Sequence, residues 1–110
     1  MGSLEQTDAL GAKGATHPRV SLADIDAAIE SIYFVNAGKA LGGSTPAREN
    51  LHILTLCFVV MKNGFIVVGK SAPASPENYD EAKGKTFARE DAMRQLWPLM
   101  AFSLRDQLAT

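Results

Sequence analysis

The sequence lacks several features that would assign it to a familiar functional class. A single cysteine excludes a disulfide within the chain, and two histidines are too few to build a zinc site without other ligands. Eleven basic and twelve acidic side chains leave a formal net charge of −1, which gives no general attraction to nucleic acids or membrane surfaces. No apolar run approaches the ~20 residues that span a bilayer, and no secretory signal is present. We therefore expect a cytoplasmic protein without a membrane or nucleic-acid partner.

Motifs that carry catalysis are also missing. Cys57 stands among apolar strand residues, where a thiol is usually an inert part of the core. The run from Gly42 to Thr45 is not followed by the Gly-Lys-Ser/Thr of a phosphate-binding loop and reads as a flexible loop. Glu90 and Asp91 are neighbours, so they point to different sides of a helix. We expect a protein that is not an enzyme and has no metal or cofactor.

The length and composition that remain are those of one globular domain. The chain has 110 residues, of which 46% are hydrophobic and 21% charged. Residues 1–17 are rich in Gly, Ala, Thr and charge, and we expect a flexible tail outside the core. Residues 18–110 are expected to form a single α+β domain. Its first element is a helix over residues 22–36, introduced by a capping box of Ser21 and Asp24. Residues 38–50 are then expected to form a flexible loop.

The strongest local pattern is an antiparallel β-hairpin of residues 51–62 and 65–71. Asn63-Gly64 between them is the preferred pair for a two-residue type I′ turn. Such a turn would place Val60 opposite Val67 and make both faces of the hairpin apolar. We expect the second face, or the strand edge, to meet another subunit, so the hairpin would belong to an oligomeric sheet or interface, most simply in a homodimer. The alternative is a monomer in which helices wrap both faces.

The C-terminal part reads as a loop over residues 72–80 followed by a kinked pair of helices. Small residues and a leucine recur at helical spacing and should allow close packing on the hairpin; they are Ala82, Ala88, Ala92 and Leu96. Pro98 removes a helical hydrogen bond and should kink the helix or start a new one. Trp97 is expected to be a core or interface anchor rather than a stacking platform.

Six residues are candidates for binding a ligand. Arginines suit bidentate binding of phosphates, whereas aromatic and amide side chains can hold a base by stacking or hydrogen bonds. The candidates are Phe65, Asn78, Tyr79, Arg89, Arg94 and Arg105. The alternative is that the arginines form ordinary salt bridges on the helix surface.

A set of motifs in the last two thirds of the chain carries a resemblance to a known family. In order, they are Lys62-Asn63-Gly64-Phe65, Gly69-Lys70-Ser71-Ala72, Ser75-Pro76-Glu77-Asn78-Tyr79-Asp80, Ala88-Arg89-Glu90-Asp91-Ala92 and Leu96-Trp97-Pro98-Leu99. Together with Pro18-Arg19-Val20-Ser21, this order resembles a family of small tailed-phage and prophage proteins over residues 18–108. None of these motifs is catalytic.

Some such phage proteins look related to the anti-Thoeris proteins, which sequester cyclic nucleotide immune signals as oligomers. The resemblance implies an anti-defence protein in the bacterial cytoplasm with a nucleotide pocket at a subunit interface. The sequence departs from the family at Met100-Ala101-Phe102, where Glu-Gly-Tyr is expected, so a carboxylate and a phenol of the family are missing here. A protein-interaction module that binds a host or phage protein through the apolar hairpin face is the competing hypothesis.

Overall fold

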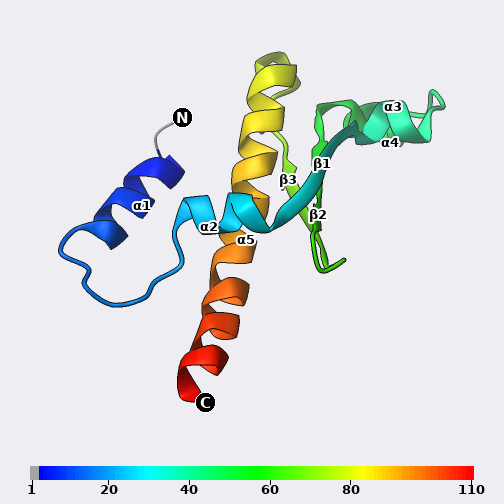
Figure 1. Cartoon of the computed structure of the whole chain (residues 1–110). Helices are drawn as coiled ribbons and strands as arrows, with labels where there is room; N and C mark the ends of the chain where they lie inside the picture. The colour runs from blue at the N-terminus through cyan, green and yellow to red at the C-terminus, as the bar shows by residue number, and fades with distance from the viewer. Residues whose placement is uncertain (1–2) are drawn as a thin grey trace.

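The structure, a computed structural model, describes residues 3–110 and places one long helix on one face of a three-stranded antiparallel sheet (Figure 1). The sheet order is β1-β2-β3, and the predicted α+β class is confirmed. The helices are α1 (Ser3–Ala12), α2 (Leu22–Ala28), α3 (Ala37–Leu41), α4 (Pro46–Glu49) and α5 (Glu81–Ala109). The strands are β1 (Ile29–Asn36), β2 (Thr55–Met61) and β3 (Ile66–Ser71), and two 3-10 helices are η1 (Asn50–Ile53) and η2 (Pro76–Asn78).

The first helix is shorter than predicted, and a strand follows it. The capping box is confirmed, because the Asp24 amide donates to Ser21 Oγ over 3.1 Å and the Ser21 amide to Asp24 Oδ2 over 2.8 Å. The predicted helix over residues 22–36 is nevertheless wrong beyond Ala28, since residues 29–36 form β1 and pair with β2. Consecutive aromatic and β-branched residues from Ile32 to Val35 favour the extended chain once a partner strand is available.

The hairpin is confirmed, but its predicted turn type and register are wrong. The Met61 amide donates to the Phe65 carbonyl and the Gly64 amide to the Met61 carbonyl, both over 2.8 Å, so the loop has three residues. Gly64 has a φ of 89°, and every residue with a positive φ among residues 3–110 is a glycine. Asn63 therefore lacks the positive φ that a type I′ turn requires. Val60 therefore pairs with Ile66 rather than with Val67.

The one-residue shift moves every side chain of β3 to the other face of the sheet. Val67 joins the buried face, where Cys57 and Val59 lie, while Ile66 and Val68 join Phe58 on the opposite face.

The segment expected as a flexible loop folds into α3 and α4, and the first residues of the strand predicted over 51–62 form η1 instead. Asn36 connects this block to the sheet, because its side-chain oxygen accepts from the Lys39 amide over 3.1 Å. Its side-chain Nδ2 donates to the His52 carbonyl over 2.7 Å and to the Tyr79 hydroxyl over 3.1 Å. The loop prediction failed because these capping and tertiary hydrogen bonds come from residues outside the glycine-rich stretch.

Helix α5 covers one face of the sheet and forms most of the core with β2 and β3. It is one helix of 29 residues that runs through Pro98, not the expected pair. Ala88, Ala92 and Leu96 are buried as expected, whereas Ala82 is exposed. A Cβ at Gly69 would lie 2.1 Å from the Ala88 carbonyl oxygen, so the helix can approach β3 only because this position has no side chain.

The N-terminal segment contributes to the core. Leu4 of α1 is only 2% exposed and belongs to the core cluster, which corrects the expectation that residues 1–17 lie outside it. The Asp8 carboxylate accepts from Arg19 over 2.6 Å and from the Leu22 amide over 3.0 Å, which fixes α1 to the start of α2. These bonds lower the pKa of Asp8, the one from Arg19 most. Residues 1 and 2 of the predicted tail lie outside the described part of the chain.

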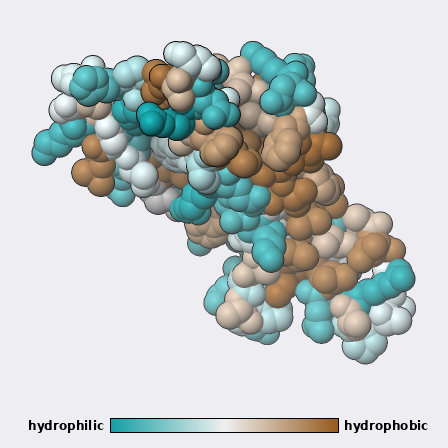
Figure 2. Space-filling model, turned by 90° about the horizontal axis from the view of Figure 1, so that it is seen from below, coloured by the Kyte–Doolittle hydropathy of each residue, from teal (hydrophilic) through white to brown (hydrophobic). Residues whose placement is uncertain are grey.

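The outer face of the sheet, opposite α5, carries apolar side chains at seven positions. They are Tyr33, Val35, Leu56, Phe58, Val60, Ile66 and Val68. Tyr33, Ile66 and Val68 are exposed, and the others are half-buried. An antiparallel sheet with one solvated face normally alternates apolar and polar residues, and here that alternation is absent. Seen from below, hydrophobic side chains gather in a band across the molecule (Figure 2).

Thr55 offers a test of core packing on the other face. Its hydroxyl is buried without a hydrogen-bond partner in the described structure, close to the helix backbone at Gly84. Thr55→Val removes this unsatisfied group with little change in shape and should raise the free energy of unfolding by about 1 kcal/mol. Urea denaturation measures the change. Thr55→Ser, which keeps the hydroxyl and loses a methyl group, is the control and should destabilise the fold; a loss of stability in Thr55→Val would contradict this packing.

Candidate functional site

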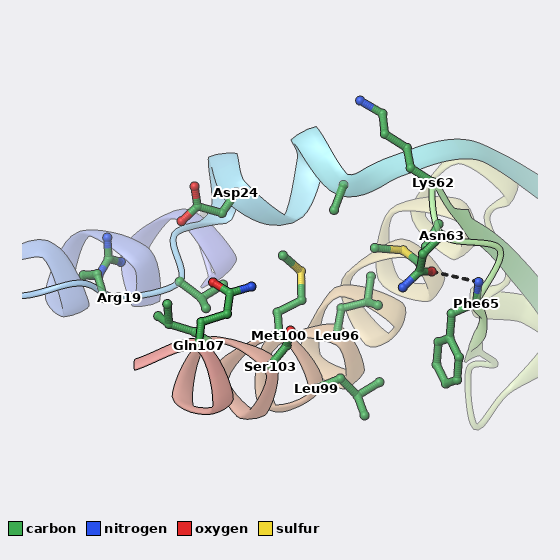
Figure 3. Close-up of a pocket in the computed structure, with 14 residues that line it drawn as sticks. Arg19, Asp24, Lys62, Asn63, Phe65, Leu96, Leu99, Met100, Ser103 and Gln107 are labelled. Atoms are coloured by element: carbon green, nitrogen blue, oxygen red, sulfur yellow. Dashed lines mark hydrogen bonds between the residues drawn. The ribbon is translucent and has the colours of Figure 1, made fainter. Parts of the chain in front are cut away.

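The described surface carries an apolar groove of about 610 Å³ between the hairpin turn, α2 and the C-terminal half of α5 (Figure 3). Its apolar lining consists of Val20, Ala28, Met61, Phe65, Leu96, Leu99, Met100 and Leu104. Its polar lining consists of Arg19, Asp24, Lys62, Asn63, Ser103 and Gln107. We call this hollow the tip groove, because the hairpin turn forms one end of it.

The hairpin turn places an aromatic ring at the tip groove. Phe65 follows directly on the left-handed Gly64, and its amide donates to Asn63 Oδ1 over 2.9 Å, drawn as the dashed line in Figure 3. This hydrogen bond orders the turn locally. Phe65 is 54% exposed, so its ring is available to a ligand. The three-residue loop, which the sequence did not predict, therefore sets where this side chain lies.

Helix α5 provides the long wall of the tip groove. Leu96, Met100, Ser103 and Gln107 recur at spacings of three and four, so they lie along one face of the helix. Figure 3 shows them following the helix away from the hairpin turn. Leu96 is buried in the core, whereas the residues beyond it extend past the sheet. The continuation of α5 through Pro98 thus creates this wall.

Charged groups stand at the two ends of the tip groove. Arg19 and Asp24 are at the end near α1, and Lys62 is at the hairpin end. Arg19 is held by the Asp8 carboxylate, and Asp24 by the Ser21 amide, whose hydrogen bond lowers the pKa of the Asp24 carboxyl most. These two groups are ordered by the N-terminal capping network, so this end of the groove is preformed.

The structure separates the six residues that the sequence grouped as a ligand site. Only Phe65 lines the tip groove. Asn78 and Tyr79 line a smaller hollow of about 240 Å³ at the start of α5, beside the loop after β3. Arg89 forms an ion pair with Asp26 of α2 at 3.2 Å, which agrees with the alternative of ordinary salt bridges.

The other two arginines also lie outside the tip groove lining. Arg94 lies 3.8 Å from the carboxylate of Glu90, and Arg105 is exposed on the last turns of α5. Sequence reasoning missed the groove residues of α5. The signal that could have found them is the recurrence of apolar residues at helical spacing from Leu96 to Leu104, beyond the end of the sheet.

The described residues give no sign of a reactive centre at Cys57. Its side chain is fully buried, and burial raises the pKa of its thiol. A neutral, inaccessible thiol is a poor nucleophile, in line with the predicted core role. Residues 3–110 hold no group of three or more side chains placed to bind a metal ion. In the same range, no helix is both long and apolar enough to cross a membrane.

Comparison with known proteins identifies the family. No curated protein and no solved structure matches the chain. The model of the phage protein (N4 Gp49/phage Sf6 gene 66) family matches residues 20–108, which include the sheet and nearly all of α5 but not α1. The resemblance to small phage proteins over residues 18–108 is thereby confirmed. The chain belongs to the N4 Gp49/phage Sf6 gene 66 family of phage proteins.

Proposed function

We propose that this phage protein is a non-enzymatic binding protein that acts in the host cytoplasm as a homo-oligomer and sequesters a nucleotide-type immune signal. The observation that carries the ligand part is the tip groove, an apolar hollow with the exposed ring of Phe65 at one end. Its volume of about 610 Å³ falls in the range of about 300–1,000 Å³ that small-molecule sites occupy.

The chemistry of the groove suits a base joined to a phosphate. Stacking of a base on an aromatic side chain contributes about 1–3 kcal/mol, and Phe65 can provide that surface. Lys62, three residues earlier in the turn, also lines the groove. Its ammonium group points away from the ring in Figure 3, so it contacts a phosphate bound there once its flexible side chain turns inward. In this proposal Lys62 takes the role that the sequence assigned to Arg89 and Arg94, which are held in ion pairs.

Met100, where the sequence departs from the family pattern, belongs to the same site. Met100 lines the groove where the resemblance leads us to expect a glutamate. A thioether places no negative charge against a bound phosphate and adapts its shape to an irregular ligand. The substitution therefore changes the pocket without removing its capacity to bind an anion.

The test is a calorimetric and thermal-shift panel of cyclic and linear nucleotides. A ligand that binds only the folded protein raises the melting temperature. Phe65→Ala should weaken binding about tenfold or more, which corresponds to about 1.4 kcal/mol of lost stacking. Ile66→Ala, the next residue but on the outer face of the sheet, is the matched control and should bind normally.

Two outcomes would overturn this proposal. The first is that no nucleotide shifts the melting temperature. The second is that chromatography after long incubation finds the nucleotide converted to a product, which would show an enzyme rather than a binder.

A second candidate function is supported by the outer face of the sheet. Its exposed side chains Tyr33, Ile66 and Val68 are apolar, and such faces commonly mark protein interaction sites. On this hypothesis the protein binds a host or phage protein through that face. This hypothesis predicts that the Ile66→Lys variant no longer binds the partner protein. That result, together with no nucleotide binding by either the wild type or the variant, would favour it over the first candidate.

A further inference from the structure

The two edges of the sheet differ in their hydrogen bonding. The Met61–Phe65 pair is hydrogen-bonded, and bonded and non-bonded pairs alternate in antiparallel strands, so the backbone groups of Val68 and Lys70 point away from β2. Side chains of α5 satisfy one group of each residue: Asp91 Oδ2 accepts from the Lys70 amide over 2.9 Å, and Gln95 Nε2 donates to the Val68 carbonyl over 2.8 Å. The side chains of Asp91 and Gln95 therefore occupy the β3 edge and obstruct the approach of another strand.

The β1 edge has no such cover in residues 3–110. β1 is the other outermost strand, and no further strand of the described chain pairs with it. The same alternation turns the backbone groups of Tyr33 and Val35 toward β2 and those of Ile32 and Phe34 toward the free edge. The only irregularity of the β1–β2 ladder lies between Ile29 and Ser31, so the rest of the strand is regular. An open, regular and apolar edge is a template for another strand.

We propose that β1 pairs antiparallel with β1 of a second copy, about a two-fold axis next to Tyr33, to form a six-stranded sheet. The inference rests on the self-association in the proposed function and names the surface that carries it. In this register Ile32 lies opposite the partner's Phe34, and each of these pairs exchanges two backbone hydrogen bonds. Tyr33 lies opposite the partner's Tyr33 in the central non-hydrogen-bonded pair, where side chains are closest.

The features of the two edges favour a second copy over other occupants. Each chain offers one open edge and one obstructed edge, so strand pairing ends at two copies and forms a closed dimer rather than a filament. No like charges meet across the axis, since Glu30 lies opposite the partner's Asn36. The aromatic pair at the axis adds a favourable cross-strand contact. The two outer apolar faces also become one continuous surface.

Sedimentation velocity on two matched lysine variants tests this dimer. Tyr33 and Ile66 are both on the outer face and are 58% and 59% exposed, so lysine at either position should leave the fold intact. Tyr33→Lys places two ammonium groups opposite each other at the axis and should give a monomer. Ile66→Lys lies two strands away from the axis and should stay a dimer. Mixing Tyr33→Lys with Tyr33→Glu should restore a dimer through opposite charges.

Hydrogen exchange supplies a second readout. The amides of Ile32 and Phe34 should be protected in the wild type and should exchange at least tenfold faster in Tyr33→Lys. A monomeric wild type would overturn the edge dimer, as would a dimeric Tyr33→Lys. If Ile66→Lys were a monomer, the edge dimer would be overturned in favour of a dimer packed through the outer faces. If a different protein protected the β1 amides, the strand that pairs with β1 would belong to that protein and not to a second copy. Because Tyr33 does not line the tip groove, nucleotide binding by Tyr33→Lys separates a failed dimer from a failed binding function.

Discussion

Gly69→Ala is expected to be the most damaging small substitution in the chain, with a loss of about 3 kcal/mol or more in the free energy of unfolding. The added Cβ would lie 2.1 Å from the Ala88 carbonyl oxygen and 2.7 Å from the Ala92 amide nitrogen. Both atoms belong to the helix backbone, so no change of side-chain rotamer relieves the clash. Helix α5 would have to move away from β3 and would lose contacts along its buried stripe.

Denaturation by urea or heat measures this effect, and the melting temperature should fall by roughly 10 °C or more. Val68→Ala, the neighbouring exposed position, is the control and should change stability by less than about 1 kcal/mol. The double variant Gly69→Ala/Ala92→Gly is the sharper test, because it removes the Ala92 methyl group and leaves the backbone in place. Rescue by the second substitution would mean that the backbone does not approach as closely as we describe.

Trp97→Ala is expected to lower the free energy of unfolding by about 3 kcal/mol. The ring packs against the core cluster, and its Nε1 donates to the Val20 carbonyl over 2.9 Å. The substitution therefore leaves a cavity and an unpaired carbonyl, and it loosens the segment that carries Arg19 into the tip groove. The sequence-based interpretation of Trp97 as a core anchor rather than a stacking platform agrees with these contacts.

A graded series separates packing from hydrogen bonding at this position. Trp97→Phe keeps most of the apolar volume and should cost about 1 kcal/mol or a little more. Phe102→Ala, on the same helix but 70% exposed, should cost no more than about 0.5 kcal/mol. Equal losses in Trp97→Ala and Phe102→Ala would contradict the anchoring role.

The features that the sequence predicted correctly depend on neighbouring residues. The capping box needs only Ser21 and Asp24, three residues apart. The small-residue stripe at Ala88 and Ala92 follows from helical periodicity alone. Such local rules are sufficient where no distant segment competes.

The features that the sequence did not predict depend on distant partners. Residues 29–36 contain isoleucines at helical spacing and become a strand because β2, whose residues lie 19 to 32 positions further along the chain, is there to pair with them. The observed register of the hairpin differs by one residue from the predicted register because Asn63 keeps a negative φ. The preference of Asn-Gly for type I′ turns had indicated a positive φ at this residue. One dihedral angle therefore decided which face Ile66 and Val68 occupy.

The candidate site shows the same division. Phe65 was predicted from its place at the hairpin turn and lines the tip groove. Arg89 was grouped with it by charge alone, yet its partner is Asp26, 63 positions earlier in the chain. The groove itself follows from the length of α5 beyond the sheet, which depended on whether the helix continued through Pro98.

Native mass spectrometry of the protein purified from phage-infected or lysogenic cells tests the central claim most directly, because it reports the subunit number and any retained small molecule together. The account predicts a dimer, or a higher even-numbered assembly, that carries one additional mass of nucleotide size for each subunit. A strict monomer with no retained mass would contradict both the self-association and the ligand-binding function.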